Sequence, residues 1–138
     1  MIAGIVITHS ALAEGLKAAV EMIAGPQENF ESIGLQEGGS LETLSAEITA
    51  KAQSFRDQGM PVMVFVDLYG ATPFNASCLS FAADDVHVLT GANLPMLLSF
   101  AMNRMAGDEV SALVENCLKD SREGIQNVSM VEMFGEVK

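Results

Sequence analysis

Near the start of the chain the apolar positions form first a continuous run and then a helical stripe. Residues 2–7 are apolar and rich in β-branched side chains, which is typical of a parallel strand buried on both faces. After the polar triplet Thr8-His9-Ser10, apolar side chains recur every three or four positions up to residue 23, which predicts an amphipathic helix. Because serine is a preferred N-cap residue, we expect Ser10 to cap this helix. The pattern therefore predicts a strand that leads directly into a helix, with His9 at the junction.

The succession of strand and helix repeats along the chain. Strand-like runs occupy residues 30–35, 61–66 and 85–90, and helical spacing occupies residues 41–55, 72–83, 94–105 and 110–118, with Asp108 as the cap of the last helix. Thr72 followed by Pro73 is a strong helix start, with Thr72 as N-cap. Residues 128–134 alternate loosely and predict an edge strand. We therefore predict an α/β fold: a single doubly wound, mainly parallel sheet with helices on both faces and a C-terminal edge strand, in one domain over residues 1–138.

Charge and composition narrow the classes of partner. The net charge of -11 argues against nucleic acid or an anionic membrane and permits attraction to a basic protein surface. No apolar stretch approaches the ~20 residues of a membrane span, and no basic segment precedes the first apolar run as it would in a signal peptide. Cys78 and Cys117 form no C-x-x-C pair and are typical of reduced cysteines. We expect a cytoplasmic protein.

Three polar side chains are predicted to meet at one edge of the sheet. His9 ends the first strand, Asp67 ends the third, and Thr72 begins the helix that follows the third strand. Strands one and three commonly flank the point where the strand order of such a sheet reverses, and ligands bind there. Each residue alone has an ordinary structural explanation, but their convergence favours a functional site.

The residue types suggest a nucleophilic imidazole. A carboxylate that accepts one ring N–H fixes the tautomer, leaves the other nitrogen free to attack, and stabilises the positive charge that develops on the ring. Backbone N–H groups at the Ser10 helix and the Thr72 hydroxyl would surround the oxygens of an incoming phosphoryl group. No lysine, arginine or metal ligand is close in sequence, so we expect a transient phosphohistidine, with no metal and no cofactor, rather than a nucleotide site.

Three segments carry a resemblance to a known family: residues 4–10 (GIVITHS), 66–75 (VDLYGATPFN) and 90–96 (TGANLPM). Together they resemble the enzyme IIA component of the mannose family of the bacterial phosphoenolpyruvate-dependent sugar phosphotransferase system (PTS), over essentially the whole chain. The second and third segments are specific to that family, whereas a strand followed by a histidine is not. One departure is Gly70-Ala71, where many members have two glycines; it alters the loop without removing a reacting group.

The resemblance implies a phosphotransferase component that accepts a phosphoryl group from phospho-HPr on His9. The group passes to a IIB component, which phosphorylates the sugar during uptake through the membrane pair IIC/IID, so that the membrane proteins are partners only indirectly. Asp67 matches the carboxylate that orients the histidine, and Thr72 matches the hydroxyl facing the phosphoryl group. Ser10 and Ala71 are candidate phosphoryl contacts through backbone or side chain.

The resemblance also implies an assembly. It predicts a homodimer in which the final strand, around residues 128–131, pairs across subunits. Because some members are fused to IIB and this sequence ends at Lys138, it predicts a IIB component on a separate protein. The sugar stays open, since a IIA component never touches it.

Two other readings of the same site remain. One is a regulatory phosphohistidine domain that reports the phosphorylation state of the PTS, including signalling of the dihydroxyacetone-kinase type. The other is a flavodoxin-like enzyme for a small ligand, which would require that His9 be dispensable. Neighbouring genes for IIB, IIC and IID would favour transport, and their absence from the genome would favour signalling.

Overall fold

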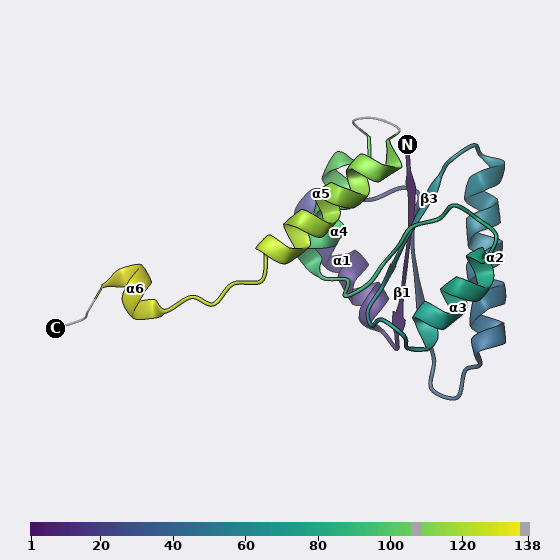
Figure 1. Cartoon of the computed structure of the whole chain (residues 1–138), viewed down its shortest axis with the longest axis horizontal. Helices are drawn as coiled ribbons and strands as arrows, with labels where there is room; N and C mark the ends of the chain where they lie inside the picture. Colours follow the sequence, from purple (N-terminus) through teal and green to yellow (C-terminus); the bar gives the residue numbers. More distant parts are fainter. Residues whose placement is uncertain (106–108, 136–138) are drawn as a thin grey trace.

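Four parallel strands form one sheet in the order β2-β1-β3-β4 (Figure 1). The computed structural model describes residues 1–105 and 109–135. The strands are β1 (Ala3–His9), β2 (Phe30–Leu35), β3 (Val62–Val66) and β4 (Val88–Leu89). The predicted α/β fold with a parallel sheet is confirmed, although β4 is shorter than the predicted strand over residues 85–90.

Helices cover both faces of the sheet, which Figure 1 shows edge-on. One face carries α1 (Leu12–Ala24), α4 (Leu94–Asn103) and α5 (Val110–Glu123), and the other carries α2 (Leu41–Asp57) and α3 (Thr72–Phe81). None of the helices in the described part of the chain is long and apolar enough to cross a membrane.

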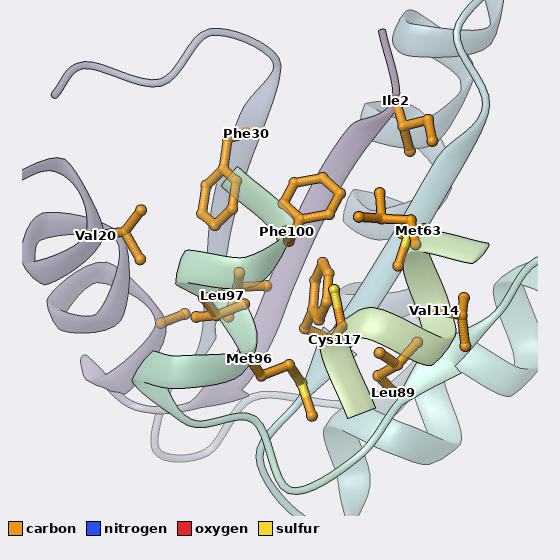
Figure 2. Packing of buried hydrophobic residues seen from close by; sticks show 14 residues of the cluster. Ile2, Val20, Phe30, Met63, Leu89, Met96, Leu97, Phe100, Val114 and Cys117 are labelled. Atoms are coloured by element: carbon orange, nitrogen blue, oxygen red, sulfur yellow. The ribbon is translucent and has the colours of Figure 1, made fainter. Parts of the chain in front are cut away.

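Side chains of the two central strands alternate between two cores. From β1, Val6 packs against α1, α4 and α5, while Ile5 and Ile7 pack against α2 and α3. Figure 2 shows the first core, where strand side chains meet Val20 of α1, Phe100 of α4 and Cys117 of α5. Burial on both faces explains why β1 and β3 are continuous apolar runs in the sequence.

Arg104 fastens α4 to the sheet at the end opposite to His9. Its side chain is almost fully buried, and its guanidinium donates to the carbonyl oxygens of Ile2, Glu28 and Asn29 and to the Gln27 side chain. It also lies against the Phe30 and Phe100 rings. Burial lowers the pKa of the Arg104 guanidinium, although Glu28 opposes the shift. This arginine satisfies three carbonyl groups at the amino ends of β1 and β2.

The predicted C-terminal edge strand is wrong. Residues 125–129 have no regular structure and lead into a short helix, α6 (Met130–Phe134), which lies away from the sheet (Figure 1). Ser129 caps α6 by accepting the N–H of Glu132. A strand is stable only when its backbone pairs with another strand, and this segment pairs with none of the four strands in the described residues.

Two of the predicted helix caps are also wrong, and a third lies outside the described residues. The N-caps of α1 and α3 are Ala11 and Ala71, not Ser10 and Thr72. Ser10 instead forms the turn after β1, and Thr72 is already the first residue of its helix. The predicted cap Asp108 belongs to the segment that is not described.

Candidate functional site

The site lies where the sheet changes its winding direction. After β1 the chain enters α1 on one face, and after β3 it enters α3 on the other face, while β1 and β3 are neighbours. This is the topological switch point at which open α/β sheets bind ligands beyond the carboxyl ends of the strands. The sequence placed His9 and Asp67 at these two strand ends, and the structure brings them into contact.

A single oxygen of Asp67 holds His9 in two ways. Asp67 Oδ2 accepts a hydrogen bond from the backbone N–H of His9 at 3.0 Å and lies 2.8 Å from the ring nitrogen Nδ1. An ionised carboxylate can only accept, so Nδ1 carries the proton and Nε2 keeps its lone pair. The Asp67 side chain is 13% exposed and the His9 side chain 48% exposed. The arrangement thus buries the orienting group and leaves the ring accessible.

The protonation of Asp67 depends on His9. Burial by itself raises the pKa of the Asp67 carboxyl, but the hydrogen bonds from the His9 backbone and ring, together with the positive charge that the imidazole carries when it is protonated, outweigh it and lower the pKa. The second oxygen, Oδ1, is buried and has no hydrogen-bond partner in the described part of the chain. The side-chain hydrogen bonds of this carboxylate are therefore directed at His9.

Thr8 braces the turn that carries His9, and its role was missed in the sequence. Its buried hydroxyl accepts the N–H of Ala13 at 2.7 Å and donates to the His9 carbonyl oxygen at 3.1 Å. Thr8 thereby supplies the N-terminal hydrogen bond to α1 that was expected of Ser10. A hydroxyl residue a few positions before a helix is a recognisable signal, but two candidates stood side by side in Thr8-His9-Ser10.

The loop between β3 and α3 is also braced by a side chain. Asn75 donates through Nδ2 to the Gly70 carbonyl oxygen at 3.1 Å, and Gly70 has a φ of 81°. Ala71 follows in extended conformation, and Thr72 begins α3 with a half-buried side chain that makes no hydrogen bond to a described residue. Asn75 therefore fixes the loop that leads from Asp67 to Thr72.

The helices α1 and α3 have N-cap residues without a side-chain acceptor, although the Thr8 hydroxyl accepts one first-turn N–H group of α1, that of Ala13. Neither Ala11 before α1 nor Ala71 before α3 offers a side-chain acceptor, whereas Ser40 caps α2 and Asn93 caps α4. Uncapped first-turn N–H groups are free to bind an anion, and the helix dipole favours negative charge there.

The rim of the site is apolar and contains no cluster suited to a metal. Leu68 and Tyr69 are 58% and 75% exposed, and the Tyr69 ring packs against Phe74 with centroids 4.8 Å apart. Over residues 1–105 and 109–135, no group of three or more His, Cys, Asp and Glu side chains is arranged to hold a metal ion.

A carboxylate-oriented histidine thus lies at the switch point of a parallel sheet, where the N-termini of two helices favour an anionic ligand. Residues 4–118 match the family model described as "PTS system fructose IIA component" (EIIA-man). The chain belongs to this family of PTS IIA components.

Individual relatives agree with the family assignment. The chain is 34% identical over 127 residues to the PTS system mannose-specific EIIAB component of Escherichia coli K12, covering 91% of this chain and 39% of that protein. The chain thus spans about two-fifths of the length of that relative. It is 32% identical over 120 residues to the sorbose-specific EIIA component of Lacticaseibacillus casei, covering 86% of this chain and 85% of the relative.

A solved structure supports both fold and family. The crystal structure of phosphotransferase system component EIIA from Streptococcus agalactiae superposes with a TM-score of 0.83 at 30% identity, covering 92% of this chain and 97% of that one.

Proposed function

We propose that His9 is the phosphoryl acceptor and that its Nε2 atom is the nucleophile. The observation that carries the proposal is the bond between Nδ1 and Asp67 Oδ2, which leaves Nε2 as the ring nitrogen with a free lone pair on a half-exposed side chain. In the transfer, Nε2 forms a bond to phosphorus while the bond from phosphorus to the donor breaks and its electron pair leaves with the donor. The Nδ1 proton stays on the ring, and Asp67 stabilises the positive charge that develops there.

Contacts to the phosphoryl oxygens would come from the N-terminal turns of α1 and α3, whose N-cap residues offer no side-chain acceptor. Ser10 and Ala71 precede α1 and α3, and Thr72 opens α3. Backbone N–H groups in these turns and the Thr72 hydroxyl would bind the three oxygens, in the manner that helix N-termini bind phosphate. These contacts offset the negative charge only in part, which suits a group that must leave again.

The partners we propose are proteins. Phospho-HPr is the donor and a PTS IIB component is the acceptor, so that the membrane components IIC/IID are reached only through IIB. The exposed Leu68 and Tyr69, which follow Asp67 directly in the chain, support a protein partner, because aromatic side chains are enriched at the centre of such interfaces. The net charge of -11 disfavours nucleic acid. We place this single carrier domain in the cytoplasm, where Cys78 and Cys117 stay free.

We further propose that the protein forms a homodimer through its C-terminal segment. The segment carries a run of apolar side chains that are exposed in the described part of the chain: Ile125, Val128, Met130, Val131, Met133 and Phe134. A second copy would cover them. Val131→Glu/Phe134→Glu should shift the molar mass measured by light scattering from dimer to monomer, and an unchanged dimer would exclude this segment as the interface.

The test of the carrier function is a phosphorylation assay with two histidine variants. Wild type, His9→Ala and His87→Ala are incubated with phosphoenolpyruvate, enzyme I and HPr, and their intact masses are measured. His87 is the other of the two histidines, so its variant is the matched control. We expect one acid-labile phosphoryl group on wild type and His87→Ala and none on His9→Ala.

Two results would count against the proposal. Labelling of His9→Ala would place the acceptor elsewhere, and no labelling of a folded wild type would exclude HPr as donor. Addition of IIB then tests the second step, because a carrier loses its label to IIB whereas a purely regulatory phosphohistidine keeps it.

A further inference from the structure

Gly34 of β2 lies against the turn that presents His9. In the register of β1 with β2, Thr8 is opposite Gly34 and His9 is opposite Leu35. The pairing continues one residue beyond β1, because the Ser10 N–H donates to the Leu35 carbonyl oxygen at 2.8 Å. Ser10 then turns the chain with a φ of 52°, in the left-handed region that a non-glycine residue seldom adopts. This turn lies directly beside the Cα atom of Gly34.

A side chain at position 34 would occupy the space of the Ser10 carbonyl group. A Cβ atom added to Gly34 falls well inside 3.0 Å of the Ser10 carbonyl oxygen and 3.2 Å from its carbonyl carbon. Both are backbone atoms, so no flexible side chain can rotate away to relieve the overlap. Either β2 or the His9–Ser10 turn must move.

The turn is the part whose displacement disturbs His9. Ser10 follows His9 directly, and the His9 carbonyl is held by the Thr8 hydroxyl while its N–H is held by Asp67. Moving the Ser10 carbonyl rotates the peptide between Ser10 and Ala11, and because Ser10 is bonded directly to His9, the displacement passes to His9 and shifts the imidazole relative to Asp67 Oδ2. A displacement of about 1 Å in a reacting group can slow a reaction about 100-fold.

We propose that Gly34 is a positioning residue for phosphoryl transfer: the missing side chain at this position lets the Ser10 carbonyl pass over β2, and this passage sets the place of His9. The inference rests on the proposed role of His9 as acceptor. Gly34 itself touches neither the ring nor the phosphoryl group. An isolated glycine within a strand is the sequence signal of such a close backbone approach.

Gly4 provides the matched control. It lies in the neighbouring strand β1, and a Cβ atom there would meet the Phe100 ring at 2.6 Å, inside the core and towards the opposite end of the strand from His9. Gly4→Ala therefore adds the same methyl group to the same sheet without touching the turn. It reports what a general loss of packing does to the site.

The test is a comparison of Gly34→Ala, Gly4→Ala, Ser10→Gly and Gly34→Ala/Ser10→Gly. Nitrogen-15 chemical shifts report which ring nitrogen of His9 carries the proton, and quenched-flow mixing with phospho-HPr gives the rate of phosphoryl acceptance. We expect Gly34→Ala to lose the uniform Nδ1–H tautomer and to slow acceptance at least about tenfold. Gly4→Ala should keep both the tautomer and the rate while unfolding at a lower temperature.

The double variant separates positioning from simple loss of stability. A glycine in the turn adopts conformations of either φ sign, so the carbonyl can swing aside while His9 stays near Asp67. Gly34→Ala should then slow acceptance less than about twofold in the Ser10→Gly background, against at least about tenfold in the wild-type background. Should Gly34→Ala alone fail to fold, the double variant carries the test, and a double variant that is unfolded overturns the proposal.

Other outcomes are equally decisive. A wild-type tautomer and rate in Gly34→Ala, or equal slowing by Gly34→Ala in both backgrounds, overturns the proposal. If HPr does not phosphorylate the wild type, the acceptor role of His9 is excluded. If the His9 tautomer still changes in Gly34→Ala, that change supports the positioning role of Gly34.

Discussion

Replacing Asp67 with asparagine removes a charge and keeps the shape of the side chain, and the structure predicts which way the new amide faces. With its oxygen toward His9, the amide accepts both the backbone N–H and the Nδ1–H, as Oδ2 does now. With its nitrogen toward His9, the amide N–H group would face the backbone N–H of His9, and that backbone N–H would have no acceptor. The amide could then make only one hydrogen bond to His9, from its nitrogen to Nδ1, whereas the first orientation makes two. The first orientation is therefore favoured, and the Nδ1–H tautomer should survive.

The expected loss of rate follows from this orientation. In a serine protease, the corresponding change costs ~10⁴-fold because the histidine adopts the wrong tautomer. Here only the charge is lost. Two unit charges about 4 Å apart at an effective dielectric constant near 20 attract by about 4 kcal/mol. With roughly half to three-quarters of a charge developed on the ring, the transition state loses about 2–3 kcal/mol, which slows acceptance roughly 30- to 150-fold.

The assay combines single-turnover phosphorylation by phospho-HPr with nitrogen-15 spectra of His9. Asp67→Ala is the companion variant, since it leaves the same two donors without any acceptor and imposes no tautomer. We expect the rates to fall in the order wild type, Asp67→Asn, Asp67→Ala. A loss near ~10⁴-fold in Asp67→Asn, accompanied by the Nε2–H tautomer, would show that the backbone N–H does not orient the amide. A wild-type rate would show that Asp67 serves only the turn.

The other predictions concern pH, stability and thiol reactivity. The pKa of Asp67 in the folded protein is lowered from its ordinary value of 3.8. The ionised carboxylate therefore stabilises the fold at pH values above 3.8, and this stabilisation is lost as the pH falls from 3.8 through the pKa of the folded protein. Urea titrations from pH 7 to pH 3 should therefore show the advantage of wild type over Asp67→Asn shrinking at the acid end. Arg104→Met leaves three carbonyl groups without their donor and should cost about 3 kcal/mol or more of unfolding free energy, measured in urea; a loss below about 1 kcal/mol would contradict this role. Burial raises the pKa of the Cys117 thiol to about 11, so a thiol reagent at neutral pH should label only the exposed Cys78 until the protein unfolds.

Much of the fold can be predicted from local patterns of apolar and polar residues. Runs such as residues 62–66 are apolar at every position because a central parallel strand is covered on both faces, and helices with one apolar stripe are covered on one face. These periodicities, with the right-handed crossover rule, predict the sheet and the side on which His9 and Asp67 emerge. The residue types at the two strand ends then predict a carboxylate-oriented imidazole.

Errors in the prediction fall where the backbone finds a hydrogen-bond partner distant in sequence. Ser10 was expected to cap α1, but its N–H pairs with Leu35 of the next strand, and Thr8 takes over the cap. Residues 128–134 have an alternation that suits a strand, but they pair with none of the strands β1 to β4 that the structure describes, and α6 forms instead.

The sequence by itself determined the kind of fold, the identity of the two groups that meet at its switch point and the family to which they point, because these depend on local periodicity and residue type. Only the tertiary structure decided that one oxygen of Asp67 holds both the backbone and the ring of His9, and that the turn carrying His9 passes over the bare Cα of Gly34. The physical reason is that both contacts join different strands. Their geometry depends on the register of the sheet, which no single stretch of the chain contains.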